Sequence, residues 1–147
     1  MSVVILDATP LGILCHPRNP PHVMACRMWV DDLLTVGRRV IVPEIADYEV
    51  RRELVRLNSA IGLSNLDLLA RHLEFLPIAT PAMRLAAELW AQARSTGQPT
   101  ASHHSLDADV ILAAQAIGLN ETVIVATGNP SHLSRFVAAD LWSNIRP

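Results

Sequence analysis

The chain has 147 residues, of which 50% are hydrophobic and 18% charged, and its formal net charge is −2. A chain of this length and apolar content can bury its own core, which excludes a largely disordered protein. All twelve basic residues are arginines, and fourteen acidic residues outnumber them, so bulk charge does not favour a protein that coats nucleic acid. A nucleic acid could still bind at one local site.

The predicted elements begin with a strand at residues 3–6, because VVIL is a continuous apolar run typical of a strand buried on both faces. Apolar residues at helical spacing then predict a helix over residues 20–36, which Gly37 ends. That helix carries Met24, Met28 and Trp29, which could pack in the core or form part of a partner surface. A second short strand is expected at residues 40–42.

Pro43 is well placed as the first residue of a helix that runs to about Ala60. Ser64 can cap the next helix, which extends to about Leu73. A third strand is expected at residues 75–78. Thr80 and Pro81 then start a helix that ends at Gly97, and residues 98–105 are expected to form a loop.

The last predicted elements are a helix from Asp107 to about Leu119, a strand at residues 122–126 and a short strand at residues 140–145. Strands that alternate with helices imply crossover connections. We therefore expect an α/β protein with three layers (α/β/α) and a mostly parallel sheet of about five strands, as one domain over residues 1–147.

No apolar run approaches the roughly 18 residues that a membrane span needs, and the start, MSVVILDATP, lacks the basic region of a signal peptide. Cys15 and Cys26 do not form a C-x-x-C pattern, which favours reduced, packed thiols. The sequence thus predicts a cytoplasmic protein without membrane contact.

Ligands of parallel α/β sheets bind beyond the carboxyl ends of the strands. Asp7, Glu49, Asp109 and Asn129 all fall at strand ends or on helices next to them. Each also has an ordinary structural interpretation: Asp7 as a helix cap, Asp109 in a first helical turn, Glu49 in an ion pair with arginine, and Asn129 in a Gly-Asn-Pro turn.

Together, these side chains predict a metal site. Two unit charges ~5 Å apart repel by roughly 3 kcal/mol at an effective dielectric near 20. Clustered carboxylates must therefore take up protons or bind a cation. Oxygen ligands select Mg²⁺ or Mn²⁺ rather than zinc.

The chain resembles PIN-domain proteins, specifically the VapC-like nuclease toxins of bacterial type II toxin–antitoxin pairs. The resemblance covers nearly the whole chain and rests on VVILDATPLG, VPEIADYEVRREL, LDADVILAAQA and VIVATGNPSHLSRF. It implies that the family's four site positions correspond to Asp7, Glu49, Asp109 and Asn129. The supporting Ser or Thr positions correspond to Thr9 and Thr127.

The resemblance implies a metal-dependent endoribonuclease that hydrolyses RNA phosphodiester bonds, is inhibited by an antitoxin and is commonly a homodimer. In this interpretation Asp7 and Asp109 are the principal Mg²⁺ ligands, with Mn²⁺ as the alternative ion and Glu49 beside them. Asp107 is either a peripheral ligand or, as we favour, the helix cap. Asn129 departs from the acidic pattern, so a second metal would bind more weakly.

Arg51 and Arg52 share the helix of Glu49 and are candidates to bind RNA phosphates, unless they pair with acidic neighbours. His103 and His104 are expected in a solvated loop. The alternative function is a non-catalytic PIN-like protein that binds RNA or a partner through a weakened metal site. A haloacid-type phosphatase is disfavoured, because residues 7–9 read Asp-Ala-Thr rather than Asp-x-Asp.

Overall fold

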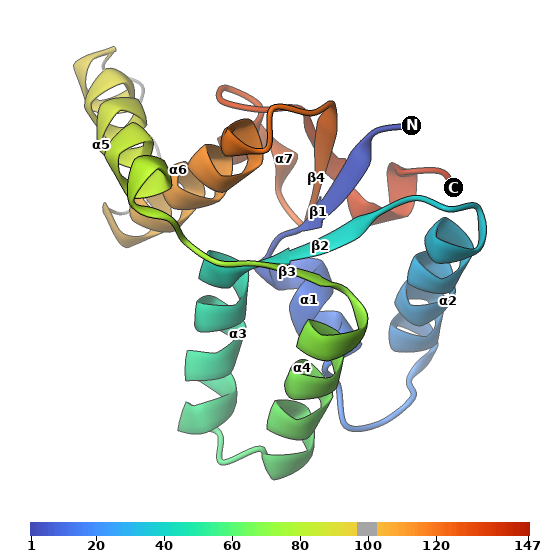
Figure 1. The fold of residues 1–147 in the computed structure, drawn as a ribbon. Coiled ribbons are helices and arrows are strands. Elements are labelled where there is room, and N and C mark those ends of the chain that lie inside the picture. The colour runs from blue at the N-terminus through green and yellow to red at the C-terminus, as the bar shows by residue number, and fades with distance from the viewer. Residues whose placement is uncertain (97–102) are drawn as a thin grey trace.

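The computed structural model describes residues 1–96 and 103–147, and in this part of the chain five parallel strands form one sheet in the order β3-β2-β1-β4-β5 (Figure 1). The strands are β1 (Val3–Leu6), β2 (Val40–Pro43), β3 (Glu74–Leu76), β4 (Val123–Thr127) and β5 (Ala139–Leu141). This sheet confirms the predicted α/β fold class. The predicted third and fifth strands are both shorter than expected and displaced by one residue.

Helices cover both faces of the sheet (Figure 1). One face carries α1 (Ala8–Leu14), α2 (Pro21–Thr35), α3 (Glu44–Arg56) and α4 (Ala60–His72). The other face carries α5 (Thr80–Ser95), α6 (His103–Gly118) and α7 (Pro130–Leu133). None of the helices within the described ranges is long and apolar enough to cross a membrane.

The alternation of side chains along β1 separates the two cores. Val4 and Leu6 pack into the core shared with α1–α4, whereas Val3 and Ile5 pack into the core next to α6 and α7. β1 is also paired on both edges, with β2 and β4. A central strand with two buried faces therefore requires the continuous apolar run that the sequence shows.

The segment after β5 packs against α2. The Trp29 indole Nε1 donates to the carbonyl oxygen of Ile145 at 2.8 Å, and the Trp29 ring lies 5.6 Å from that of Trp142, in the 3-10 helix η1 (Trp142–Asn144). Met24 and Met28, on the same helix, are 51% and 62% exposed. Trp29 is therefore a core residue, whereas the two methionines are on the surface.

The predicted thiol environment agrees with the structure, because Cys15 and Cys26 are both free and buried. They lie in the core between the sheet and α1–α4.

Two helices follow β2, as predicted, but the first is shorter than the expected span from Pro43 to about Ala60. Pro43 ends β2, and α3 ends at Arg56 because Asn58 adopts a left-handed conformation with φ 54°. The Ser59 hydroxyl then accepts a hydrogen bond from the backbone N–H of Gly62, so Ser59 caps α4. The prediction that Ser64 is this cap was wrong, since Ser64 lies inside α4.

The prediction that Asp107 caps its helix was also wrong. α6 begins at His103, so Asp107 lies more than one turn inside it. The predicted loop at residues 98–105 is partly helical, since residues 103–105 belong to α6, while residues 98–102 lie outside the described part. The side chains of His103 and His104 also lie outside it.

Candidate active site

Asp7 connects the central strand to the first helix. β1 ends at Leu6 and α1 begins at Ala8, so Asp7 is the N-cap, and its Oδ1 accepts the Ala8 N–H at 2.8 Å. Its other oxygen, Oδ2, accepts the Thr127 hydroxyl at 2.8 Å. Asp7 therefore caps α1, as its structural interpretation predicts, and also lies at the strand end, where its carboxylate can take part in a site.

Thr127 and Asn129 come from the end of the neighbouring strand β4. Thr127 is buried, and its hydroxyl oxygen accepts the Asn129 backbone N–H at 3.1 Å while its proton goes to Asp7. The Asn129 side-chain Oδ1 accepts the Ser131 hydroxyl at 2.7 Å. Thr127 thus joins the two strand ends and fixes the orientation of the Asp7 carboxylate.

Glu49 and Asp109 approach from helices on opposite faces of the sheet, α3 and α6. Their side chains are 23% and 18% exposed. Together with Asp7 they line a cleft of about 190 Å³ at the carboxyl edge of the sheet. The full lining is Asp7, Ala8, Thr9, Glu49, Ala108, Asp109, Thr127, Asn129 and His132. The cleft therefore contains all four candidate site residues and both supporting threonines.

The three carboxyl groups share one electrostatic environment. Burial and then the charge of Asp7 raise the pKa of Glu49 to about 7, with a smaller effect from Asp109 and an opposing one from Arg52. Burial and then Asp7 raise the pKa of Asp109 to about 6, against His132 and Arg135. Burial also raises the pKa of Asp7, although its bonds to Thr127 and Ala8 act in the opposite direction.

This donor set has the chemistry of a site for a divalent cation. Three partly buried carboxyls that disfavour one another's charge are stabilised by a cation of two charges, and their oxygens suit Mg²⁺ or Mn²⁺. As they stand, no three acidic, histidine or cysteine side chains of the described residues are arranged to hold a metal ion. A cation here would therefore take part of its coordination from water.

Two residues near the carboxylates were not predicted. The His132 imidazole lines the cleft, with Nδ1 3.9 Å from Asp109 Oδ2. Arg135 holds the turn behind it, since its Nε donates to the His132 carbonyl oxygen at 3.2 Å. The sequence contains one signal that could have identified His132. Pro130 starts a helix, and a residue three positions after Asn129 lies on the same side of that helix as Asn129.

The two arginines proposed for phosphate binding differ in position. Arg51 makes ion pairs with Asp47 and Asp67, both at 2.9 Å, so it pairs with acidic neighbours rather than being available for a phosphate. Arg52 lies next to the site, 3.9 Å from Glu49, and its guanidinium stacks over the Tyr48 ring at 5.1 Å.

Asp107 is not among the residues that line the carboxylate cleft. It lines a separate groove between α5 and α6, together with Met83 and Trp90. No structural observation therefore supports Asp107 as a peripheral ligand.

Thr9 is exposed and lies against Gly128 at the edge of the cleft. A Cβ atom added to Gly128 would lie 2.7 Å from Thr9 Cγ2 and 2.9 Å from Thr9 Oγ1. The absence of a side chain at Gly128 thus lets the loop after β4 approach α1 closely.

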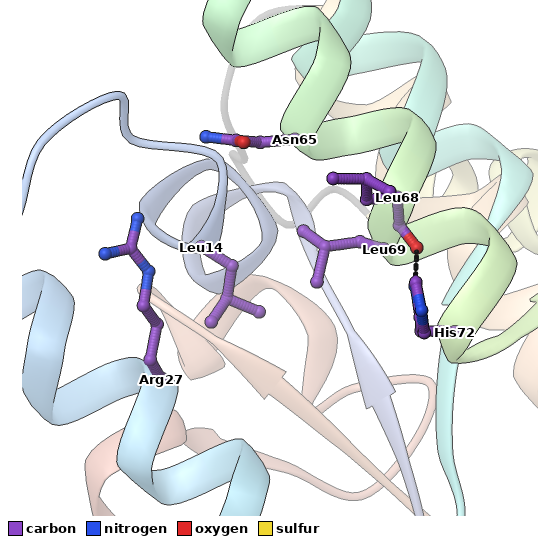
Figure 2. Close-up of a pocket in the computed structure, with 6 residues that line it drawn as sticks. All are labelled: Leu14, Arg27, Asn65, Leu68, Leu69 and His72. Carbon is purple, nitrogen blue, oxygen red and sulfur yellow. Dashed lines mark hydrogen bonds between the residues drawn. The ribbon is translucent and has the colours of Figure 1, made fainter.

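On the side of the sheet that carries α1–α4, two hollows lined by described residues are larger than the carboxylate cleft. One of about 340 Å³ adjoins it between α1 and α3, sharing Thr9 and Glu49 and continuing to Leu54. The other, of about 310 Å³, is shown in Figure 2, where Leu14 lies between Arg27 of α2 and Leu69 of α4. Its described lining contains no carboxylate, so it is not part of the candidate metal site.

The fold and the cleft together define the class of protein. The PIN domain family matches residues 4–134, and the chain therefore belongs to this family. None of the curated proteins matches the chain in sequence.

Solved structures share the fold at low sequence identity. VapBC2 from Rickettsia felis, bound to a DNA fragment from their promoter, has a TM-score of 0.74 and 16% identity, covering 95% of this chain and 98% of that one. FitAcB from Neisseria gonorrhoeae has a TM-score of 0.71 and 21% identity, covering 97% and 100%. VapBC-1 from nontypeable Haemophilus influenzae has a TM-score of 0.68 and 14% identity, covering 97% and 99%.

Proposed function

We propose that this PIN-domain protein is a metal-dependent endoribonuclease that acts as the toxin of a toxin–antitoxin pair. The observation that carries the proposal is the meeting of Asp7, Glu49 and Asp109 in one cleft, although they lie on separate elements far apart in sequence. A fold needs no such cluster of repelling carboxylates, so a function in binding a cation and a phosphodiester accounts for it best.

In the proposed mechanism, Asp7 and Asp109 hold Mg²⁺ or Mn²⁺, partly through water, with Glu49 beside them. When bound, the ion lowers the pKa of a water and neutralises charge on the phosphoryl oxygens. Glu49 orients the attacking water and accepts its proton. Thr127 keeps the Asp7 carboxylate in place, and Asn129 and Thr9 hold waters at the edge of the cleft.

RNA is the proposed substrate, and Arg52 is the proposed partner for its phosphates. Arg52 stands at the edge of the cleft, more than half exposed, and its contact with Glu49 is a long one at 3.9 Å. It can therefore turn toward a phosphate at little cost. Arg51 is omitted from this role, because Asp47 and Asp67 already pair with it.

The proposed protein partner is an antitoxin, and the proposed oligomer is a homodimer. The similar structures VapBC2 and VapBC-1 are solved under names that pair two components, VapB and VapC. Their similarity to this chain and the VapC-like sequence segments support a partner of the VapB kind. If a short reading frame adjoins this one, co-expression of its product should relieve any growth arrest that the chain causes.

The direct test is cleavage of RNA by the purified protein, with Mg²⁺ and with a chelator. The chelator should abolish cleavage, and Asp109→Asn should reduce the rate at least about a hundredfold, because a group that stabilises the transition state is lost. Asp32→Asn, an exposed aspartate of α2, is the matched control and should cleave at the wild-type rate. If Asp109→Asn also cleaves at that rate, the site assignment is wrong.

A non-catalytic RNA- or partner-binding protein is the second candidate. The observation in its favour is Asn129, which leaves the cleft with three carboxylates rather than four. Thermal unfolding with increasing Mg²⁺ or Mn²⁺ separates the two functions, because only a site that binds the ion raises the melting temperature. A flat titration, together with no cleavage, would favour the second candidate.

A further inference from the structure

His132 places an imidazole next to the carboxylates. Among the described residues that line the cleft, it is the only histidine, and its side chain is 36% exposed. The 3.9 Å between its Nδ1 and Asp109 Oδ2 is too long for a hydrogen bond. The two groups therefore do not bind each other directly, and an ion could bind to both.

The separation of the two atoms suits a shared metal ion. Two ligands about 2.1 Å from one ion can lie at most about 4.2 Å apart, when they face each other across it. The 3.9 Å between His132 Nδ1 and Asp109 Oδ2 is within this limit. One ion could bind both atoms after a small shift of the side chains that brings the ligand–ion–ligand angle to that of a regular site.

The backbone around His132 is held in place independently of any ion. Pro130 occupies the first turn of α7, and the Nε of Arg135 donates to the His132 carbonyl oxygen at 3.2 Å. The Arg135 guanidinium itself stacks over the Phe136 ring at 4.6 Å. A fixed backbone keeps the Cβ atom of His132 in place, so that only rotation of the side chain positions the imidazole beside Asp109.

We propose that His132 supplies a nitrogen ligand to the divalent ion of the candidate active site, beside Asp109. This inference rests on the proposed function and adds the identity of one ligand and the preferred class of metal. An imidazole among carboxylates favours Mn²⁺ and other transition metals over Mg²⁺, which prefers oxygen. The site of the proposed nuclease therefore binds a transition metal more tightly than Mg²⁺.

Pulsed electron paramagnetic resonance of bound Mn²⁺ tests the ligand directly and without any activity assay. With one equivalent of Mn²⁺, the wild-type protein should give the nitrogen modulation of a directly bound imidazole. His132→Gln should lose this modulation and bind Mn²⁺ on the order of tenfold more weakly, with a smaller change for Mg²⁺. His22→Gln, an exposed histidine of α2, is the matched control and should keep both.

The outcomes separate this inference from the proposed function. Suppose that Mn²⁺ binds the wild-type protein without nitrogen modulation and does not bind Asp109→Asn. This result would overturn the proposal that His132 is a ligand, but it would support the carboxylate site. Nitrogen modulation that persists in His132→Gln would also overturn it. A wild-type protein that binds no Mn²⁺ at all would overturn both this inference and the metal-dependent nuclease.

Discussion

Asp7 combines a structural and a chemical role in a single side chain. One oxygen caps α1 through Ala8, and the other is held by Thr127. Asparagine caps helices about as well as aspartate does, whereas alanine does not. A substitution to asparagine therefore removes the charge and keeps the cap.

We predict that Asp7→Asn and Asp7→Ala both abolish RNA cleavage but differ in stability. Without metal, Asp7→Asn should unfold with a free energy equal to or above that of wild type, because repulsion with Glu49 and Asp109 is relieved. Asp7→Ala should be less stable than Asp7→Asn by about 1 kcal/mol, the usual value of a cap. Urea unfolding measures both, and equal stability of the two variants would show that the cap contributes nothing.

The raised pKa values of Glu49 and Asp109 predict how stability depends on pH. In the folded protein these values are about 7 and about 6, above the ordinary 4.5 and 3.8. Between these limits the folded state binds more protons than the unfolded state, so stability falls as pH rises through this window. For Glu49 the loss should be on the order of 3 kcal/mol, complete above its folded pKa.

Unfolding in urea at pH 5 and pH 8, with a chelator present, measures this effect. Glu49→Gln should show a smaller loss between the two pH values than wild type does. Addition of Mg²⁺ or Mn²⁺ should stabilise the wild-type protein at pH 8, where the carboxylates are charged, and should have a much smaller effect at pH 5. An unchanged difference in Glu49→Gln would contradict the shared electrostatics of the cleft.

The close approach of the loop after β4 to α1 depends on Gly128. We predict that Gly128→Ala lowers the free energy of unfolding by about 1–3 kcal/mol, because its Cβ would overlap the Thr9 side chain. Thr9→Ala in the same chain should recover most of the loss, since the two overlapping atoms are removed. Urea unfolding of the two single variants and the double variant gives the coupling. A Gly128→Ala protein as stable as wild type would contradict this packing.

The sequence predicts an element well where one strong local signal determines it. β1 is such an element, because a run of four apolar residues between polar neighbours suits only a buried strand. The break between α3 and α4 was predicted, but a few residues too late, since apolar residues continue through it and only the left-handed Asn58 ends the helix. α1 was not delimited either, because seven residues are too few for a helical period to emerge.

The candidate site was predictable to the extent that it follows the carboxyl ends of the strands. Asp7 follows β1 directly and Asn129 lies just past the end of β4, after Gly128, so sheet topology alone brings them close. His132 could not be found in this way, because its position depends on how α7 packs beside α6. The pairing of Arg51 with Asp67 likewise depends on the packing of α3 against α4, which a single sequence does not specify.

On the scale of the whole molecule, Trp29 ties α2 to a segment more than a hundred residues later. We predict that Trp29→Phe lowers the free energy of unfolding by about 1–3 kcal/mol, because the Ile145 carbonyl loses its donor and a cavity opens beside Trp142. Trp90→Phe, in the half-buried groove of α5, should have a smaller effect. Thermal unfolding compares the two, and equal effects would contradict the link.

The burial of both thiols gives the molecule a built-in reporter of its own opening. Burial raises the pKa of Cys15 and of Cys26 to about 12, so near neutral pH almost no reactive thiolate forms in the folded state. An alkylating reagent can therefore modify either sulfur only after an opening that separates it from the buried side chains around it. The rate of modification in native buffer thus counts these separations, and a cellular oxidant would encounter the same barrier.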